Sequence, residues 1–156
     1  YRTVAFMVKS IKNSRYFKTK AYKNASPAWI LAGSLKNKTD EHINTRVILE
    51  KIRTKLINSG LAKFADDGAI RSILRSQQLQ SSDIFTKKGM IKLKKLFNSS
   101  IILKGVISNK RIRTKLIHKL KYKITLKAIW LKNNIILWKD TLVIRRMKKI
   151  SRKKIK

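Results

Sequence analysis

The residues that could do chemistry in this chain are few and far apart. There are two histidines, His42 and His118, and no cysteine. A zinc site normally takes three or four Cys, His or carboxylate ligands, and the sequence brings no such set together. We therefore expect no metal and no cofactor, and we expect both histidines to be solvated surface residues.

Neighbouring carboxylates occur at two places, Asp40-Glu41 and Asp66-Asp67. Each pair precedes a segment that we expect to be helical, where capping and the helix dipole account for acidic residues. The five glycines are scattered singly, which does not fit a phosphate-binding loop. A general acid–base enzyme needs titratable groups perturbed within a cleft. The sequence therefore predicts a non-catalytic domain that works by binding.

The charge is strongly positive, with 40 Lys and Arg against 7 Asp and Glu and a formal net charge of +33. After Asp83 the only acidic residue is Asp140. One interpretation is an anionic partner: nucleic acid, lipid headgroups or an acidic wall polymer. The other is a genome rich in A and T, whose codons favour Lys, Ile and Asn. Both interpretations remain open at this point.

The size and composition fit one folded domain. A chain of 156 residues, 43% of them hydrophobic, can bury a core. No apolar run reaches the roughly 18 residues needed to span a bilayer. Because the chain begins at Tyr1 and not at Met, we expect a processed or truncated product.

Hydrophobic periodicity and turn residues predict the elements along the chain. Asn44 or Thr45 can cap one helix and Gly60 suits its end, while Thr86 can cap another. The expected helices lie over 2–17, 44–59, 69–78 and 86–97, and the expected strands over 28–33, 61–65, 101–107, 121–130 and 135–144. A turn is expected over 23–27, a basic link over 108–115 and a fraying tail over 145–156. In the helix over 69–78 we expect Ile70, Ile73 and Leu74 to point inward; in the helix over 86–97 we expect Met90, Leu93 and Phe97 to point inward and Lys87, Lys88, Lys92, Lys94 and Lys95 to point outward.

The clearest local signal is the final hairpin. Period-two alternation predicts a strand with one wet face, and Asn133-Asn134 fits a two-residue turn. The residues expected to be buried together are Tyr122, Ile124, Leu126 and Trp130. The residues expected on the opposite face are Lys121, Lys123 and Lys127, which form either a solvated stripe or a surface facing an anion or a partner. We expect Trp29, Trp130 and Trp138 to belong to the core and not to stack on nucleic-acid bases.

These elements define an α/β (α+β) fold, with a single mixed β-sheet flanked by helices and a C-terminal antiparallel hairpin. The order is roughly α-β-α-β-α-α-β-β-β. We expect an N-terminal helix and linker over 1–26, one α/β domain over 27–146, and a basic tail over 147–156.

The segment from Ile30 to Thr45 resembles the LpoB-type family of penicillin-binding-protein activators. It has a strand ending in a small residue, a Lys-Asn-Lys-Thr loop followed by Glu-His-Ile, and then a helix. The resemblance extends over about Pro27 to Arg146. The other matching positions are Ile52-Arg53-Thr54, Ser59-Gly60, Asp66, Asp67, Arg71 and Ser76-Gln77-Gln78.

This resemblance implies an outer-membrane lipoprotein, periplasmic and lipid-anchored, that binds a bifunctional penicillin-binding protein and stimulates peptidoglycan synthesis. The implied anchor is an N-terminal lipid outside this chain. Anionic envelope polymers or lipid headgroups are further candidate partners, and a nucleic-acid-binding protein is the alternative. The sequence departs from the family at Asn98-Ser99-Ser100, where a small-acidic-aromatic turn is usual, and in its stronger positive charge. The candidate partner-binding residues are Lys36, Asn37, Lys38, Thr39, Asp40, Glu41, His42, Asn44, Lys121, Lys123 and Lys127.

Overall fold

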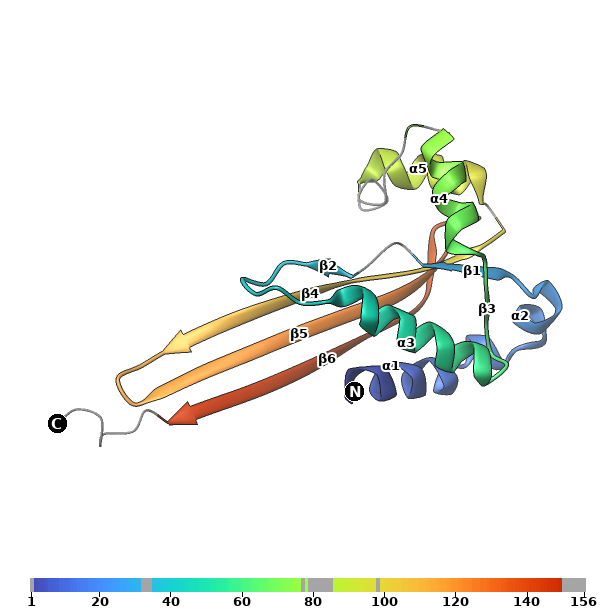
Figure 1. The fold of residues 1–156 in the computed structure, drawn as a ribbon. Coiled ribbons are helices and arrows are strands. Elements are labelled where there is room, and N and C mark those ends of the chain that lie inside the picture. Colours follow the sequence, from blue (N-terminus) through green and yellow to red (C-terminus); the bar gives the residue numbers. More distant parts are fainter. Residues whose placement is uncertain (1, 32–34, 77, 79–85, 98, 150–156) are drawn as a thin grey trace.

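The structure, a computed structural model, describes residues 2–31, 35–76, 78, 86–97 and 99–149 (Figure 1). Within this range only the backbone is described for Met90, Leu93, Lys148 and Lys149. The elements in chain order are α1 (Arg2–Asn13), η1 (Tyr16–Lys18), α2 (Lys20–Ala25), β1 (Ala28–Leu31), β2 (Lys36–Asn37), α3 (Thr45–Asn58), β3 (Lys63–Phe64), α4 (Asp67–Ser76), α5 (Lys87–Leu96), β4 (Ile101–Arg113), β5 (Ile117–Trp130) and β6 (Ile135–Lys149).

One mixed sheet organises the molecule, as the sequence predicts. Its strand order is β3-β1-β4-β5-β6, and β2 also pairs with β4. The short strands β1 and β2 run parallel to β4, whereas β4, β5 and β6 form a long antiparallel ribbon. Helices α1 and α3 lie on one side of the sheet, and α4 and α5 lie near its end on the other side (Figure 1).

The main core fills the space between α1, α3 and one face of the sheet, which we call the helix face. Apolar residues at helical spacing in α1 and α3 meet residues at alternating positions of β4, β5 and β6. An aromatic group closes one end, where the Trp29 indole N–H donates to the Tyr22 hydroxyl at 2.8 Å. The buried residues on these elements are Val4, Met7, Val8, Ile11, Leu49, Ile52, Leu56, Ile101, Leu103, Ile107, Ile124, Leu126, Ala128, Trp138 and Leu142.

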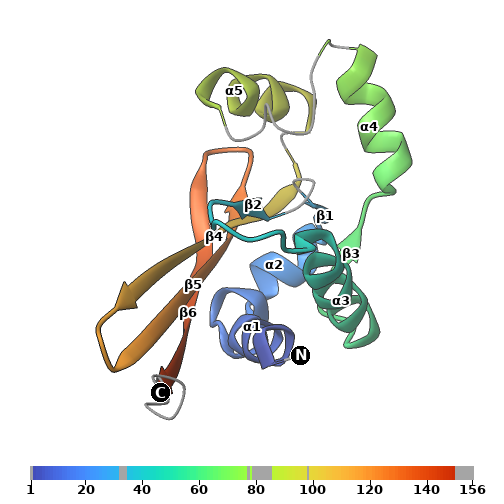
Figure 2. The ribbon, with the colours of Figure 1, turned by 60° about the vertical axis from the view of Figure 1, so that its left-hand side comes forward.

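A smaller core lies on the other side of the sheet, beneath α4. Ile70 and Leu74 of α4 pack there against Ile30, Ile102 and Ile129. This second core covers only the end of the sheet near β1. Beyond it the ribbon of β4, β5 and β6 extends well past the helices, so no described helix covers that side of the far strands (Figures 1 and 2).

Gly105 allows β4 and β5 to approach closely at the middle of the ribbon. A Cβ atom at this position would lie 2.2 Å from the backbone oxygen of Thr125 and 2.6 Å from a methyl group of Leu126. No side chain fits at such distances without separating the strands. Gly60 has a positive φ of 76° just after α3, which is the role predicted for it.

The antiparallel hairpin, the Asn44 cap and the four main helices are confirmed, but several predicted boundaries are wrong. The first helix ends at Asn13 and not at residue 17, and much of the predicted 23–27 turn lies in α2. The predicted basic link over 108–115 continues β4 as far as Arg113, because its backbone pairs with β5. Likewise β6 continues to Lys149 through pairing with β5, so the tail does not begin at Arg145. Neither α2 nor β2 was predicted from the sequence.

Some side chains also differ from expectation. Ile73 is 39% exposed, because α4 turns only Ile70 and Leu74 toward the sheet. Tyr122 and Trp130 are half-buried, and so is Lys127, which was expected to be exposed. Lys92 and Lys94 are half-buried on α5. The predicted inward positions of Met90 and Leu93 stay predictions, because only the backbone is described there. Gln77 and residues 150–156 lie outside the described residues. The domain boundaries at 26 and 146 stay predictions.

Candidate functional site

The candidate residues from the sequence form two separate groups on opposite faces of the sheet. Residues 36–44, which we call the 36–44 loop, lie along the edge of β4 and reach onto the helix face. Lys121, Lys123 and Lys127 point to the other face of β5, because successive side chains of a strand alternate. The structure therefore does not bring the two groups together.

The 36–44 loop is held on β4 by backbone pairing. Strand β2 pairs in parallel with β4 in the register Lys36 to Val106, and the Lys38 N–H donates to the Ile107 oxygen at 2.8 Å. Such pairing fixes the start of the loop. It depends on a strand some seventy residues later, which explains why no local pattern predicted β2.

Polar side chains fix the rest of the 36–44 loop. The Asn37 amide donates to the Glu41 oxygen at 2.9 Å, and its own oxygen accepts the Thr39 N–H at 3.0 Å. The Thr39 hydroxyl accepts the Glu41 N–H at 3.2 Å. These are the local side-chain-to-backbone bonds that Asn and Thr typically form in turns. The loop is therefore ordered before any partner arrives.

A charged cluster joins the 36–44 loop to β4 and β5. Arg111 contacts Asp40 at 2.8 Å through Nε and Glu41 at 3.0 Å through Nη2. The Asn109 amide donates to Asp40 at 2.7 Å, and the Tyr122 hydroxyl donates to Glu41. A guanidinium can serve two carboxylates because its donors lie in a fixed planar fork.

The electrostatics of this cluster follow from its hydrogen bonds. Bonds from Arg111 and then Asn109 lower the pKa of Asp40 from 3.8 to about 2. The bond to Asp40 raises the pKa of Arg111, and the bond to Glu41 raises the pKa of Tyr122. The ion pair between Asp40 and Arg111 is therefore fully formed at neutral pH.

The predicted capping role of Asp40-Glu41 is wrong, whereas that of Asp66 is confirmed. Asn44 caps α3 by accepting the Val47 N–H at 3.3 Å, so the two acidic residues are left to bind Arg111. Asp66 accepts the Ala69 N–H at 3.0 Å at the start of α4. Asp67 instead pairs with Arg53 of α3 at 2.8 Å.

Arg111, Asn109 and Tyr122 were missed as site residues. The signal for two of them was present, since Ile107, Asn109 and Arg111 alternate at period two. Read as the continuation of a strand, that spacing places Asn109 and Arg111 on the same face as Ile107. The polar composition of 108–115 hid this continuation.

Six residues of the 36–44 loop are exposed, and all of them except Asp40 lie outside the charged cluster. Lys38, His42 and Asn44 are exposed, as are Lys36 and Asn37. His118 is also exposed, so the predicted surface position of both histidines is confirmed. The loop therefore presents cationic and polar groups on a rigid backbone.

The opposite side of the ribbon carries basic residues in register across the strands, and we call it the cationic face. One row joins Lys104, Lys127 and Lys139, and another joins Lys110, Lys121 and Arg145. Lys119 and Lys123 lie at two further rows. The members of the cationic face are Lys104, Lys110, Lys119, Lys121, Lys123, Lys127, Lys139 and Arg145.

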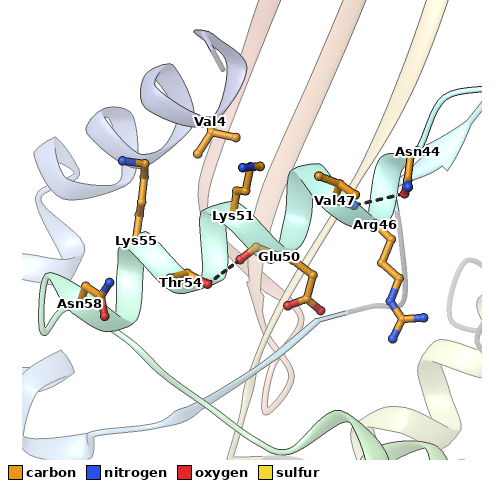
Figure 3. A pocket seen from close by; sticks show the side chains of 9 residues that line it. All are labelled: Val4, Asn44, Arg46, Val47, Glu50, Lys51, Thr54, Lys55 and Asn58. Atoms are coloured by element: carbon orange, nitrogen blue, oxygen red, sulfur yellow. Dashed lines mark hydrogen bonds between the residues drawn. The ribbon is translucent and has the colours of Figure 1, made fainter.

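A hollow of about 940 Å³ lies along the outside of α3 (Figure 3). Lys51 and Lys55 project toward Val4 of α1, whereas Glu50 and Arg46 project to the other side of the helix. Glu50 is paired with Arg53. The hollow thus gathers no set of titratable groups suited to catalysis.

Among the residues that the structure describes, no three His, Asp or Glu side chains stand close enough to hold a metal ion. Within the same residues, no helix is long and apolar enough to cross a membrane.

The fold and the 36–44 loop define a small mixed α/β domain whose surface features suit binding. The family model described as peptidoglycan-synthase activator LpoB matches residues 2–144. The chain therefore belongs to the LpoB family, and the resemblance inferred from the 30–45 segment is confirmed.

Solved structures share this fold. The LpoB C-terminal domain from Escherichia coli has a TM-score of 0.65 at 14% identity, covering 92% of this chain and 98% of that one. The corresponding domain from Salmonella enterica has a TM-score of 0.58 at 14% identity, covering 93% and 94%. Lipoprotein GNA1162 from Neisseria meningitidis has a TM-score of 0.54 at 17% identity, covering 83% and 90%. Comparison with curated protein sequences found no match.

Proposed function

We propose that this chain is a non-catalytic regulator that binds a peptidoglycan synthase of the penicillin-binding class and stimulates it. The observation that carries the proposal is the match of the LpoB family over residues 2–144. That family is known for activators of peptidoglycan synthases that are anchored to the outer membrane and act in the periplasm. The proposed location of this chain is therefore the periplasm, with a lipid tether to the outer membrane, and cell fractionation tests it.

The proposed docking surface is the exposed part of the 36–44 loop. Its backbone is fixed by β2 and by the Asp40, Glu41 and Arg111 cluster. A surface that is ordered beforehand loses little conformational entropy on binding, which favours affinity. Lys38 and His42 stand exposed on this rigid support and are the side chains that we assign to partner contact.

The test uses this chain and a purified bifunctional penicillin-binding protein from the same cell. The rate of glycan polymerisation is measured with and without the chain at about 0.15 M salt, where nonspecific charge attraction is screened. We expect stimulation by the wild-type chain. Stimulation should survive removal of residues 148–156, because β4 and β5 hold the 36–44 loop in place.

A double variant, Lys38→Glu with His42→Ala, tests the surface. We expect it to lose most of the stimulation while keeping the wild-type melting temperature, because both side chains are exposed. The matched control is Lys63→Glu with His118→Ala, which makes the same chemical changes at exposed positions away from the loop. Absence of stimulation by the wild-type chain would overturn the proposed function. Equal loss in both double variants would overturn the assignment to the loop.

A further inference from the structure

The cationic face has no acidic residue to neutralise it within the described structure. Asp40 and Glu41 lie on the helix face with Arg111, and Asp140 accepts the Ser10 hydroxyl there at 2.5 Å. The remaining described acids lie on α3 and at the start of α4. Arg53 and Arg111, the cations that pair with Glu50, Asp67, Asp40 and Glu41, do not belong to the cationic face.

The sheet register places like charges directly opposite one another. In the row of Lys104, Lys127 and Lys139, and in that of Lys110, Lys121 and Arg145, three cations stand side by side. Directly opposite side chains have Cβ atoms about 5 Å apart, and like charges there are destabilising. Burial and then the charge of Lys127 lower the pKa of Lys104. Anions from outside the chain reduce the repulsion between the cations of such an array.

The dimensions of the cationic face suit an extended anionic surface. Three strands spaced about 4.8 Å apart give a width of about 10 Å, and the steps along the strand from Lys104 to Lys110 give a length of about 20 Å at about 3.4 Å each. No described helix covers the far half of this side (Figure 2). The charges are spread in two dimensions and not along a single groove.

Apolar side chains stand at the far end of the cationic face. Ile112 is 44% exposed and Met147 is 65% exposed, and both flank Lys119 across the three strands. Leu116, in the turn that joins β4 to β5, is 50% exposed. Aliphatic groups beside basic ones are typical of surfaces that lie at a lipid interface.

The chemistry of the cationic face distinguishes a lipid surface from nucleic acid. Proteins that bind single-stranded nucleic acid without sequence preference combine cations with aromatic stacking platforms. In the five rows from Lys104 to Ile112, every residue is basic, Val, Ile, Met, Ser or Thr, and none is aromatic. Leu116, the apolar residue in the turn at the tip, is not aromatic either.

From these observations we propose that the cationic face docks on the surface of a membrane rich in anionic phospholipid, with Ile112, Leu116 and Met147 entering the headgroup layer. This interaction is separate from binding to the synthase and uses the opposite face of the ribbon from the charged cluster of the 36–44 loop. It would orient the domain along the membrane surface.

The experiment is flotation of the full chain with vesicles at about 0.15 M salt. Mixed vesicles of phosphatidylcholine and phosphatidylglycerol are compared with vesicles of phosphatidylcholine alone. We expect binding to the mixed vesicles only. The flotation experiment contains no synthase, so an absence of vesicle binding does not contradict the proposed function. An absence of synthase activation likewise does not contradict vesicle binding.

A charge variant assigns vesicle binding to the cationic face. Lys110→Gln, Lys121→Gln and Arg145→Gln together remove one exposed row. Each basic residue held near an anionic membrane contributes about fivefold in affinity, so the triple variant should bind about 100-fold more weakly. The matched control, Lys9→Gln, Lys12→Gln and Lys63→Gln, removes the same charge from exposed positions elsewhere and should bind nearly as the wild type does.

An apolar variant tests entry into the headgroup layer. Ile112→Ser with Met147→Ser should bind mixed vesicles at least several-fold more weakly than the control Ile57→Ser with Ile73→Ser, whose parent side chains are also exposed. The proposal is overturned if the wild-type chain does not float with mixed vesicles, or if both charge triples weaken binding equally. Tighter binding to an oligonucleotide than to mixed vesicles at the same salt would also overturn it, in favour of nucleic acid.

Discussion

The two faces of the long ribbon are made from the same three strands, yet they treat charge in opposite ways. On the helix face, Arg111 is paired with two carboxylates and Asp140 is bound by Ser10 of α1. On the cationic face, two complete rows consist of cations alone. Asp40, Glu41 and Asp140 thus stabilise the chain's own fold on the helix face. The charge on the other face remains available to partners outside the chain.

The largest expected effect is the loss of core packing on the helix face. Leu126 is fully buried there, so Leu126→Ala should lower the free energy of unfolding by about 3 kcal/mol. Lys123→Ala, three residues earlier on the exposed face of the same strand, should change it by less than about 0.5 kcal/mol. Urea unfolding measures both. Equal losses would show that the two faces do not differ in packing.

The next effect concerns the carboxylate that ties α1 to β6. Asp140 accepts the Ser10 hydroxyl and the Thr141 N–H, the latter at 2.8 Å. Asp140→Ala should cost about 1.5 kcal/mol, because it leaves partly buried donors without an acceptor. Asp140→Asn keeps one acceptor oxygen and should cost less. Thermal unfolding of the two variants tests this order, and the reverse order would contradict it.

A pH titration tests whether Arg111 controls the protonation of Asp40 in the charged cluster. The pKa of Asp40 is lowered in the folded state from 3.8 to about 2. Its contribution to stability is therefore complete above 3.8 and is lost as the pH falls through about 2. In the Arg111→Ala variant, the midpoint of the Asp40 titration should move back toward 3.8. NMR of the side-chain carboxyl measures it.

The control for this titration is Arg113→Ala, which removes an exposed cation two residues further along the same strand. Its midpoint should stay near that of the wild type. An unchanged midpoint in Arg111→Ala would show that Arg111 does not govern Asp40.

The smallest effect comes from the cationic face itself. Lys127 lies between Lys104 and Lys139, so Lys127→Gln should raise the free energy of unfolding by about 0.5 kcal/mol. The gain should shrink at about 1 M salt, where charges are screened over about 3 Å. Lys123→Gln is the control, since Lys123 lies between Ser108 and Val143. A gain in the free energy of unfolding from both variants would indicate that the net charge of the protein, and not the register of the strands, is the cause.

Local patterns predicted the parts of this fold that local physics determines. Alternation over 121–130 predicted the hairpin, and Asn44 and Gly60 predicted the ends of α3. The predicted two-residue turn at Asn133-Asn134 is wrong, because Trp130 pairs with Ile135 and the turn therefore holds the four residues 131–134. The far half of β4 and the short β2 could not be found in this way. Asn109, Lys110 and Arg111 have no strong strand preference, and their conformation depends on pairing with β5.

The site was predictable in part for the same reason. The sequence indicated the 36–44 loop and the lysines of β5 as candidate surfaces. It could not indicate that Arg111 and Tyr122 hold Asp40 and Glu41, because that contact spans about seventy residues or more. It also could not align Lys121 with Lys110 and Arg145, since cross-strand register is a property of the folded sheet.

We claim that the 36–44 loop, and not the cationic face, binds the synthase. The measurement that decides this is the affinity of a purified bifunctional penicillin-binding protein for three forms of this chain at physiological salt. These are the wild type, the Lys38→Glu and His42→Ala loop variant, and the Lys110→Gln, Lys121→Gln and Arg145→Gln row variant. We predict that the loop variant binds at least about tenfold more weakly, a change of about 1.4 kcal/mol, while the row variant binds as the wild type does. No binding by the wild type, or loss of binding in the row variant alone, would contradict the claim.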